Sequence, residues 1–220
     1  MFKYVMTFSK TGTICYTSHL DLMRMFKRAF KRGGIKLAYS QGFNPHPKLG
    51  FAQPLSLGYE GMKELMEFET VEEHDPSHLR EKMSTLMPPG LDIINCSRVV
   101  DEKKTLAART YAAEYIIMIP SGRMPDMTGE EMKQSYMSQE KIITLKKQKK
   151  KKEPVEIDIK PMIRDLNFTK GERLVRKAVL DSGSNSNLSP ELVINTVNEY
   201  FDMGIDRNDT EIIRTEIFYH

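Results

Sequence analysis

The chain has 220 residues, of which 40 % are hydrophobic and 29 % are charged, and its formal net charge is +3 at pH 7. This length allows one large domain or two small ones, each with a hydrophobic core. No apolar run is long enough to cross a bilayer, and the opening MFKYVMTFSKTG lacks an apolar signal core, so we expect neither a spanning helix nor a secretory leader.

Cysteine is scarce in this chain. Cys15 and Cys96 belong to no CxxC or related cluster. Two isolated thiols favour a reducing, cytoplasmic location over a disulfide framework. They also argue against an iron–sulfur cluster or a structural zinc site, so we expect no cofactor and no metal in this chain.

The first half reads as alternating strands and helices. The residue patterns predict strands at 3–9, 49–57, 64–72 and 91–100, and helices at 19–32 and 75–87. Ser18 or Thr17 would cap the first helix, which Gly33 and Gly34 would end. The order β-α-β-β-α-β is the split βαβ unit of a ferredoxin-like fold.

The second half repeats this order with an extra hairpin arm. The expected strands are 111–119, 141–147, 155–160, 173–181 and 210–219, and the expected helices are 128–138 and 189–203. We therefore predict an α+β protein of two tandem ferredoxin-like domains, residues 1–105 and 106–220, with a RAMP-like architecture. A single mixed α+β domain is the alternative.

The first helix carries opposed apolar and cationic faces. At 100° per residue, Leu22, Met23, Phe26, Ala29 and Phe30 share one side. The opposite side carries cations without apparent acidic partners: Arg24, Lys27, Arg28, Lys31 and Arg32. Like charges at this spacing repel one another, so an anion such as a nucleic-acid backbone is expected there. A solvated helix face and an acidic protein partner are the alternatives.

The loop Tyr39–Lys48, YSQGFNPHPK, combines rings, amides and a cation between stiffening prolines. Unpaired nucleotides use such groups for stacking and for hydrogen bonds to base edges. The candidate nucleic-acid-binding side chains of this loop are Tyr39, Gln41, Phe43, Asn44, His46 and Lys48. The same residues could instead plug a turn against the core.

Histidine raises the question of catalysis. His19, Tyr16 and His46 are the candidates for an RNA-cleaving site in which a 2′-hydroxyl is activated. His19, His46 and Asp21 could hold a metal if the fold brought them together. Nothing in the spacing requires either reading, and a histidine at a helix start is commonly structural.

A lysine-rich run, Lys146–Lys152, lies at the tip of the expected hairpin arm. It reads either as a solvated turn or as a basic arm that adds salt-dependent affinity for nucleic acid.

The stretch YTSHLDLMR, followed by the RAFKRGG, AYSQGFNPHP and PLSLG segments, resembles the bacterial radical SAM-linked protein family, a domain of unknown function. The resemblance implies an accessory protein for a radical SAM enzyme on a separate chain, and it brings no established catalytic residues. The tandem ferredoxin-like order also resembles CRISPR-repeat-processing endoribonucleases of the RAMP superfamily. This chain departs from them near its C-terminus, where DSGSN at 181–185 is a poor substitute for their glycine-rich loop.

These observations favour a non-catalytic protein that binds RNA or presents it to a radical SAM enzyme, in RNA modification or processing. One alternative is a metal-independent, RAMP-like endoribonuclease that uses His19. The other is an interaction module that docks an acidic protein.

Overall fold

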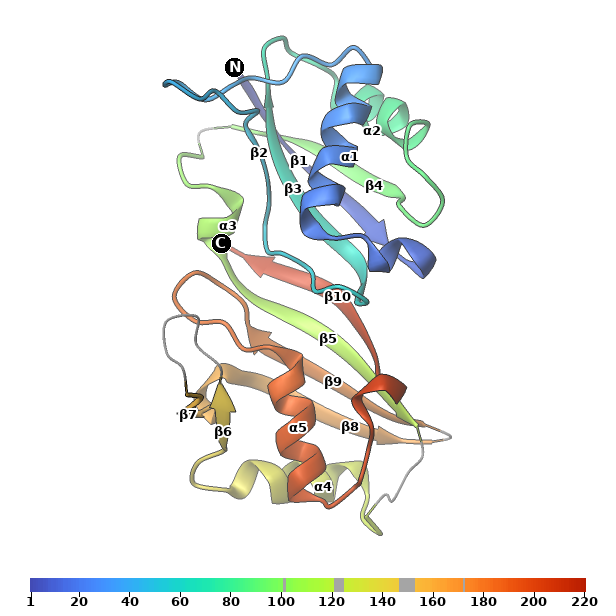
Figure 1. Ribbon diagram of the computed structural model, residues 1–220, viewed down its shortest axis with the longest axis vertical. Coiled ribbons are helices and arrows are strands. Elements are labelled where there is room, and N and C mark those ends of the chain that lie inside the picture. The colour runs from blue at the N-terminus through green and yellow to red at the C-terminus, as the bar shows by residue number, and fades with distance from the viewer. Residues whose placement is uncertain (101, 121–124, 147–152, 172) are drawn as a thin grey trace. The chain divides into compact units, whose positions relative to one another are not determined.

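The structure, a computed structural model, describes residues 1–100, 102–120, 125–146, 153–171 and 173–220 (Figure 1). The chain divides into two compact units. Unit 1 comprises Met1–Tyr111 and Arg214–His220, and unit 2 comprises Ala112–Ile213. The predicted division into domains after residue 105 concerns independent folding, and it stays a prediction.

Unit 1 is an antiparallel sheet covered by helices. Its elements are β1 (Phe2–Lys10), a 3-10 turn η1 (Gly12–Tyr16), α1 (His19–Arg32), β2 (Leu49–Phe51), β3 (Glu60–Thr70), α2 (Pro76–Ser84), β4 (Ile93–Val99) and α3 (Leu106–Arg109). The strand order is β4-β1-β3, with β2 antiparallel to β3. The C-terminal part of β10 (Glu211–Tyr219) also joins β3. The order β4-β1-β3-β2 is that of a split βαβ unit.

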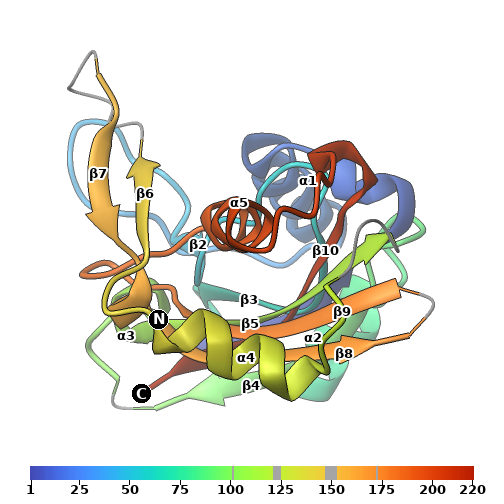
Figure 2. The ribbon, with the colours of Figure 1, turned by 90° about the horizontal axis from the view of Figure 1, so that it is seen from below.

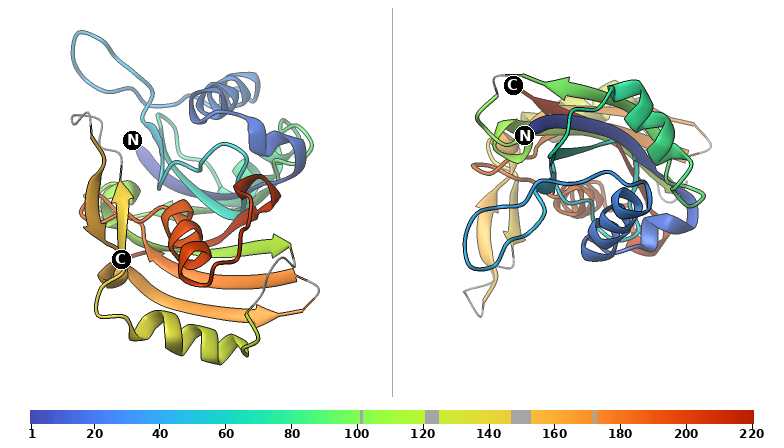
Figure 3. Two further views of the ribbon diagram at one scale, coloured as in Figure 1. Left: turned by 60° about the horizontal axis from the view of Figure 1, so that its bottom comes forward. Right: turned by 90° about the horizontal axis from the view of Figure 1, so that it is seen from above.

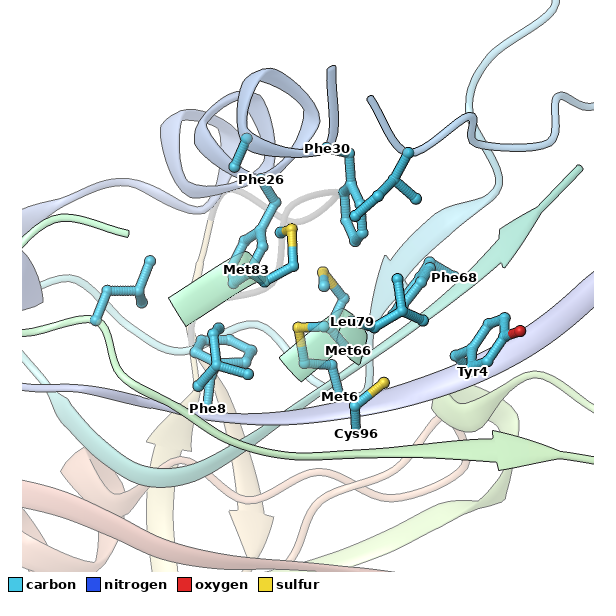
Figure 4. Packing of buried hydrophobic residues seen from close by; sticks show 14 of the residues in the cluster. Tyr4, Met6, Phe8, Phe26, Phe30, Met66, Phe68, Leu79, Met83 and Cys96 are labelled. Atoms are coloured by element: carbon cyan, nitrogen blue, oxygen red, sulfur yellow. The ribbon is translucent and has the colours of Figure 1, made fainter. Parts of the chain in front are cut away.

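The main core of unit 1 lies between this sheet and the two helices α1 and α2 (Figure 4). Strand residues alternate between faces, so Tyr4, Met6 and Phe8 of β1 point to the same side. They meet Phe26 and Phe30 of α1, and Leu79 and Met83 of α2 complete the layer. On the opposite face, a smaller cluster is formed by Val5, Ala52, Leu65, Leu106 and Ile217.

A buried ion pair fastens β10 to β3 within unit 1. Arg214 Nε and Nη2 donate to the two carboxylate oxygens of Glu64 at 2.8 and 2.5 Å. The two residues are 2 % and 4 % exposed. Arg214 also donates to the backbone oxygens of Gln53 and Pro54, so all three of its guanidinium nitrogens make hydrogen bonds.

Arg214→Met should lower the free energy of unfolding by about 3–5 kcal/mol, because Glu64 then stays buried without its counterion. Chemical denaturation followed by circular dichroism measures the change. Arg173→Met is the matched control, because Arg173 makes an exposed pair with Glu211. Its expected cost is below about 1 kcal/mol. Equal losses in the two variants would contradict a special role for the buried pair.

Unit 2 has its own sheet and two helices. Its elements are β5 (Thr110–Pro120), α4 (Gly129–Ser138), β6 (Ile143–Lys146), β7 (Val155–Asp158), a 3-10 turn η2 (Lys160–Met162), β8 (Ile163–Lys170), β9 (Arg173–Asp181), α5 (Pro190–Tyr200) and a 3-10 turn η3 (Arg207–Asp209). The main sheet has the order β5-β9-β8. Within the described ranges, strands β6 and β7 pair only with each other, and they form an arm (Figure 2). Helices α4 and α5 are joined by the bond between the Tyr136 and Thr196 hydroxyls, at 2.7 Å.

Arg176 on β9 is a buried cation without a carboxylate partner among the described residues. Its side chain is 0 % exposed, and its Nε and Nη1 have no hydrogen-bond partner in the part of the chain that the structure describes. The guanidinium carbon lies 5.7 Å from the centre of the Phe168 ring, and Nη2 donates to the Met203 sulfur at 3.6 Å. Burial lowers the pKa of Arg176 to about 9.

Arg176→Met should therefore raise the free energy of unfolding at pH 7, by about 1–4 kcal/mol. The native state binds the Arg176 proton less tightly than the unfolded state does. As the pH rises from 7 toward 10, the free energy of unfolding of the wild type should therefore increase relative to that of Arg176→Met. Urea titrations of both proteins at several pH values measure this difference. A variant that is less stable than the wild type at pH 7 would contradict the unfavourable burial.

The mixed α+β fold is confirmed, and most elements lie where the sequence predicts them. One predicted strand needs correction, because the strand at 49–57 is only Leu49–Phe51 long. The expected hairpin arm is present as β6 and β7, but the sequence patterns did not reveal β8 of the main sheet. They also did not reveal the short helix α3.

Candidate nucleic-acid interface

Helix α1 forms at the predicted residues and is fixed at both ends. The Ser18 hydroxyl accepts from the Asp21 backbone N–H at 3.2 Å, which is a standard N-cap. Gly33 ends the helix. Leu22, Phe26, Ala29 and Phe30 are buried as predicted, but it is Met25, not Met23, that packs against the core cluster.

The entry to α1 is held by a buried lysine. Lys10 is 1 % exposed, and its Nζ donates to the backbone oxygens of Cys15 and Thr17 at 2.9 and 3.0 Å. Burial lowers the pKa of Lys10, although nearby Cys15 and Glu64 oppose that shift. The ammonium thus ties the turn η1 to the end of β1, and this tie sets where α1 begins.

Some of the predicted cations already have partners. Arg24 pairs with Asp21 at 2.8 Å, so the expectation of a face without acidic partners is wrong at this position. The physical reason is the i,i+3 spacing, which places Asp21 one turn before Arg24. Arg32 donates to the Leu86 backbone oxygen at 2.8 Å.

Asp21 is held as a carboxylate. The hydrogen bond from the Ser18 hydroxyl, followed by that from Arg24, lowers the pKa of Asp21. The Asp21 charge therefore offsets the charge of Arg24 at ordinary pH.

Lys27, Arg28 and Lys31 form the unpaired part of the cationic face. Within the described residues, none of the three makes a hydrogen bond or an ion pair. Arg28 and Lys31 are exposed, and Lys27 is half-buried. Lys27 and Lys31 are four residues apart, so their charges stand on the same side of α1.

The connection Tyr39–Lys48 is a hairpin that extends away from the helices of unit 1 (Figure 3). Its base is closed by Ser40 N–H to the His46 oxygen at 2.9 Å and by Lys48 N–H to the Ala38 oxygen at 2.8 Å. Gly42 takes φ +121° near the tip, a value that favours glycine. The chain from Gln41 to His46 is exposed.

The tip therefore does not act as a plug. Phe43 is fully exposed and Tyr39 is 53 % exposed, so two rings face solvent. His46 Nδ1 donates to the Asn44 oxygen at 3.1 Å, which shapes the tip from within. Lys48 pairs with Glu69 at 2.7 Å, so its charge is already balanced.

Two grooves run along α1, and Arg28 and Lys31 border both. The larger, of about 1080 Å³, lies between α1 and residues 85–88, with Met25, Leu86 and Met87 as its apolar part. The second, of about 730 Å³, lies between α1 and the segment 34–47, with Val71 beside it. The cationic face is thus bordered on both sides by grooves that combine its charged side chains with apolar ones.

The catalytic candidates are not joined into a working group. His19 is half-buried, and its ring packs edge-on against Phe51 with centroids 5.3 Å apart. Tyr16 is 71 % exposed and lies beside Gly58. No hydrogen bond connects any two of Tyr16, His19 and His46 in the described part of the chain, and no set of three or more metal-ligating side chains gathers there.

The lysine run can be followed only at its first residue. Lys146 Nζ donates to the Asn187 oxygen at 3.3 Å. Residues 147–152 lie outside the described residues, so the basic-arm prediction stays a prediction.

Sequence reasoning missed the apolar walls of both grooves. Leu86 and Met87 follow α2, and Val71 follows β3, so they meet α1 only through the tertiary fold. No local pattern in the sequence marks these residues as neighbours of the cations. The helix predicted at 75–87, which the structure shows as α2 (Pro76–Ser84), was the one available hint, because a second helix on this sheet was expected to pack beside α1.

The protein therefore has a mixed α+β fold, with an exposed cationic helix beside a hairpin that carries exposed aromatic side chains. Its sequence matches the profile of a bacterial family, described as "Uncharacterized protein conserved in bacteria (DUF2344)", over residues 3–190. The chain belongs to this family. No curated protein matches the sequence. Across the described residues, no helix combines the length and the apolar character needed to cross a membrane.

Among solved structures, the chain is similar to one titled "Crystal Structure of a Cbf5-Nop10-Gar1 Complex". The TM-score is 0.56 and the sequence identity is 12 %. The match covers 97 % of this chain and 48 % of that chain, so the protein spans about half the length of its structural neighbour. At this identity, the likeness concerns the fold alone.

Proposed function

We propose that this protein binds RNA through unit 1, with α1 as the main contact helix. The observation that carries the proposal is the group Lys27, Arg28 and Lys31, none of which makes a hydrogen bond or an ion pair among the described residues. Three cations on adjacent turns repel one another, and a phosphate backbone would relieve that repulsion. Contacts of this kind give affinity without reading the sequence.

The hairpin favours RNA over an acidic protein as the anion. Tyr39 and Phe43 expose their rings beside Gln41 and Asn44. A ring with amides next to it offers stacking and edge hydrogen bonds, which unpaired bases use. An acidic protein surface would engage the cations but would leave these groups without a matching partner.

In this proposal the protein presents RNA to a radical SAM enzyme on a separate chain, and it does no chemistry itself. The support is the motif resemblance of the stretch from Tyr16 to Gly58. A radical SAM cluster needs several thiolates close together. Cys15 and Cys96 are both buried, and burial raises the pKa of each thiol, that of Cys96 to about 12. The reactive cluster would therefore belong to the partner.

The double variant Lys27→Ala/Lys31→Ala should weaken RNA binding and reduce its salt dependence. For a single strand, log K falls with log salt by about 0.7 per phosphate contact, so losing two contacts should reduce the slope by about 1.4. Fluorescence anisotropy with an unstructured labelled RNA at several salt concentrations measures both quantities.

The matched control for this experiment is Arg80→Ala/Lys82→Ala, which removes two exposed cations from α2 of the same unit. This control should leave affinity and slope close to those of the wild type. Binding that ignores salt, or an equal loss in the control, would overturn α1 as the RNA contact. No binding even at low salt would overturn RNA as the ligand.

Association with the enzyme should be independent of α1. When the tagged protein is purified from its host, a radical SAM protein should accompany it after nuclease treatment, and identification is by mass spectrometry. The charge-reversed variant Lys27→Glu/Lys31→Glu should still co-purify with that protein, because in this proposal α1 contacts RNA and the enzyme binds elsewhere. Absence of any radical SAM protein would refute the partnership, and loss on charge reversal would instead favour docking of an acidic protein on α1.

A further inference from the structure

The groove between α1 and the base of the hairpin has features that a phosphate backbone alone would not use. It measures about 730 Å³, which is within the range of about 300–1,000 Å³ typical of small-ligand sites. Its lining brings together Lys27 and Lys31 of α1 with Tyr39 and Pro47 of the hairpin. The groove therefore has a cationic wall and a wall that carries a ring.

Apolar side chains give this groove a floor that water solvates poorly. Leu37, which is half-buried, forms part of the lining. Val71 borders the same groove and is 53 % exposed. A purely electrostatic site for phosphates would gain nothing from these surfaces, whereas the flat face of a base would cover them.

The hairpin holds Tyr39 in place next to the cations. Tyr39 pairs with Pro47 across the hairpin base, and Ala38 N–H donates to the Glu69 oxygen of β3 at 2.8 Å. The backbone that carries Tyr39 is therefore fixed, while about half of the side chain's surface stays open to solvent. Less backbone freedom is then lost when a base stacks on the ring.

The two walls suit one strand of RNA rather than two. Lys27 and Lys31 are one helical turn apart, about 6 Å along the axis, so they can contact successive phosphates. In a duplex the bases are stacked and paired inside, and their faces cannot reach a ring or an apolar floor. A duplex would therefore use only the cations and would leave Tyr39 and Val71 uncovered.

We infer that this groove takes unpaired nucleotides, with a base stacked on Tyr39 and the flanking phosphates on Lys27 and Lys31. The inference rests on the proposed function and narrows it, because it makes the RNA substrate single-stranded at the point of contact. It also separates two roles on this surface. The lysines hold any RNA, and Tyr39 selects the unpaired form.

The test compares an unstructured RNA with a duplex of the same length by fluorescence anisotropy at one salt concentration. The wild type should bind the single strand more tightly. Tyr39→Ala should weaken single-strand binding by about tenfold to a hundredfold and leave duplex binding unchanged, and Tyr39→Phe should retain the preference. Lys27→Ala should weaken both RNAs.

The matched control is Tyr219→Ala, which removes another partly exposed tyrosine of unit 1, 44 % exposed, that does not line this groove. It should keep the wild-type preference. Circular dichroism and a thermal melt check that each variant is folded. If Tyr39→Ala fails to fold, Val71→Ser replaces it, because removing apolar surface from the groove without changing its charge should also weaken single-strand binding selectively.

The outcomes separate this inference from the proposed function. Equal binding of single strand and duplex by the wild type, or tighter binding of the duplex, would overturn the inference and leave RNA binding intact. The same holds if Tyr39→Ala weakens both RNAs equally. If the wild type binds neither RNA, the proposed function itself fails.

Discussion

The packing of α1 against the sheet of unit 1 is the contact on which the candidate interface depends. Phe26 and Phe30 are buried against Phe8 and Phe68, with the Phe8–Phe26 and Phe30–Phe68 centroids 5.1 and 4.7 Å apart. Aromatic pairs of this kind fix a helix in rotation as well as in position. Once this side of α1 is buried, its cations must face outward. The exposed charge of the interface is thus a consequence of the core.

The same unit shows how the rest of the surface is positioned. Lys10 fixes the entry to α1 through two backbone oxygens, and the backbone bonds of Ala38 and Lys48 fix the base of the hairpin. The ion pair of Arg214 with Glu64 brings in a strand from the far end of the chain. These polar contacts are buried or part-buried, where a hydrogen bond is stronger and an unpaired group more costly than at the surface. They make the site rigid while its outer side chains stay available.

The elements of the fold could largely be predicted, and the exceptions have physical causes. Strand β8 was missed because a register shift between Ile163 and Asp165 breaks the alternation of its buried residues. The strand expected at 49–57 ends at Phe51, shortly before Pro54, which lacks the N–H that a ladder needs. The arm at β6 and β7 was expected, but a pattern of alternation cannot say which sheet a strand joins. That choice depends on contacts between distant residues.

The sequence by itself determined the two faces of α1, because the helical period places Phe26 and Phe30 opposite Arg28 and Lys31. It also showed that the loop Tyr39–Lys48 carries aromatic rings between a glycine and prolines, but it left open whether the loop is exposed or plugs a turn against the core. The pairing of Arg24 with Asp21 is local, since the two residues lie three apart on one helix. Only the tertiary structure decided that Arg32 binds the Leu86 oxygen and which apolar residues lie beside the remaining cations. Val71 and Met87 become groove walls only when β3 and α2 pack beside α1, because periodicity describes one element at a time and a groove belongs to several.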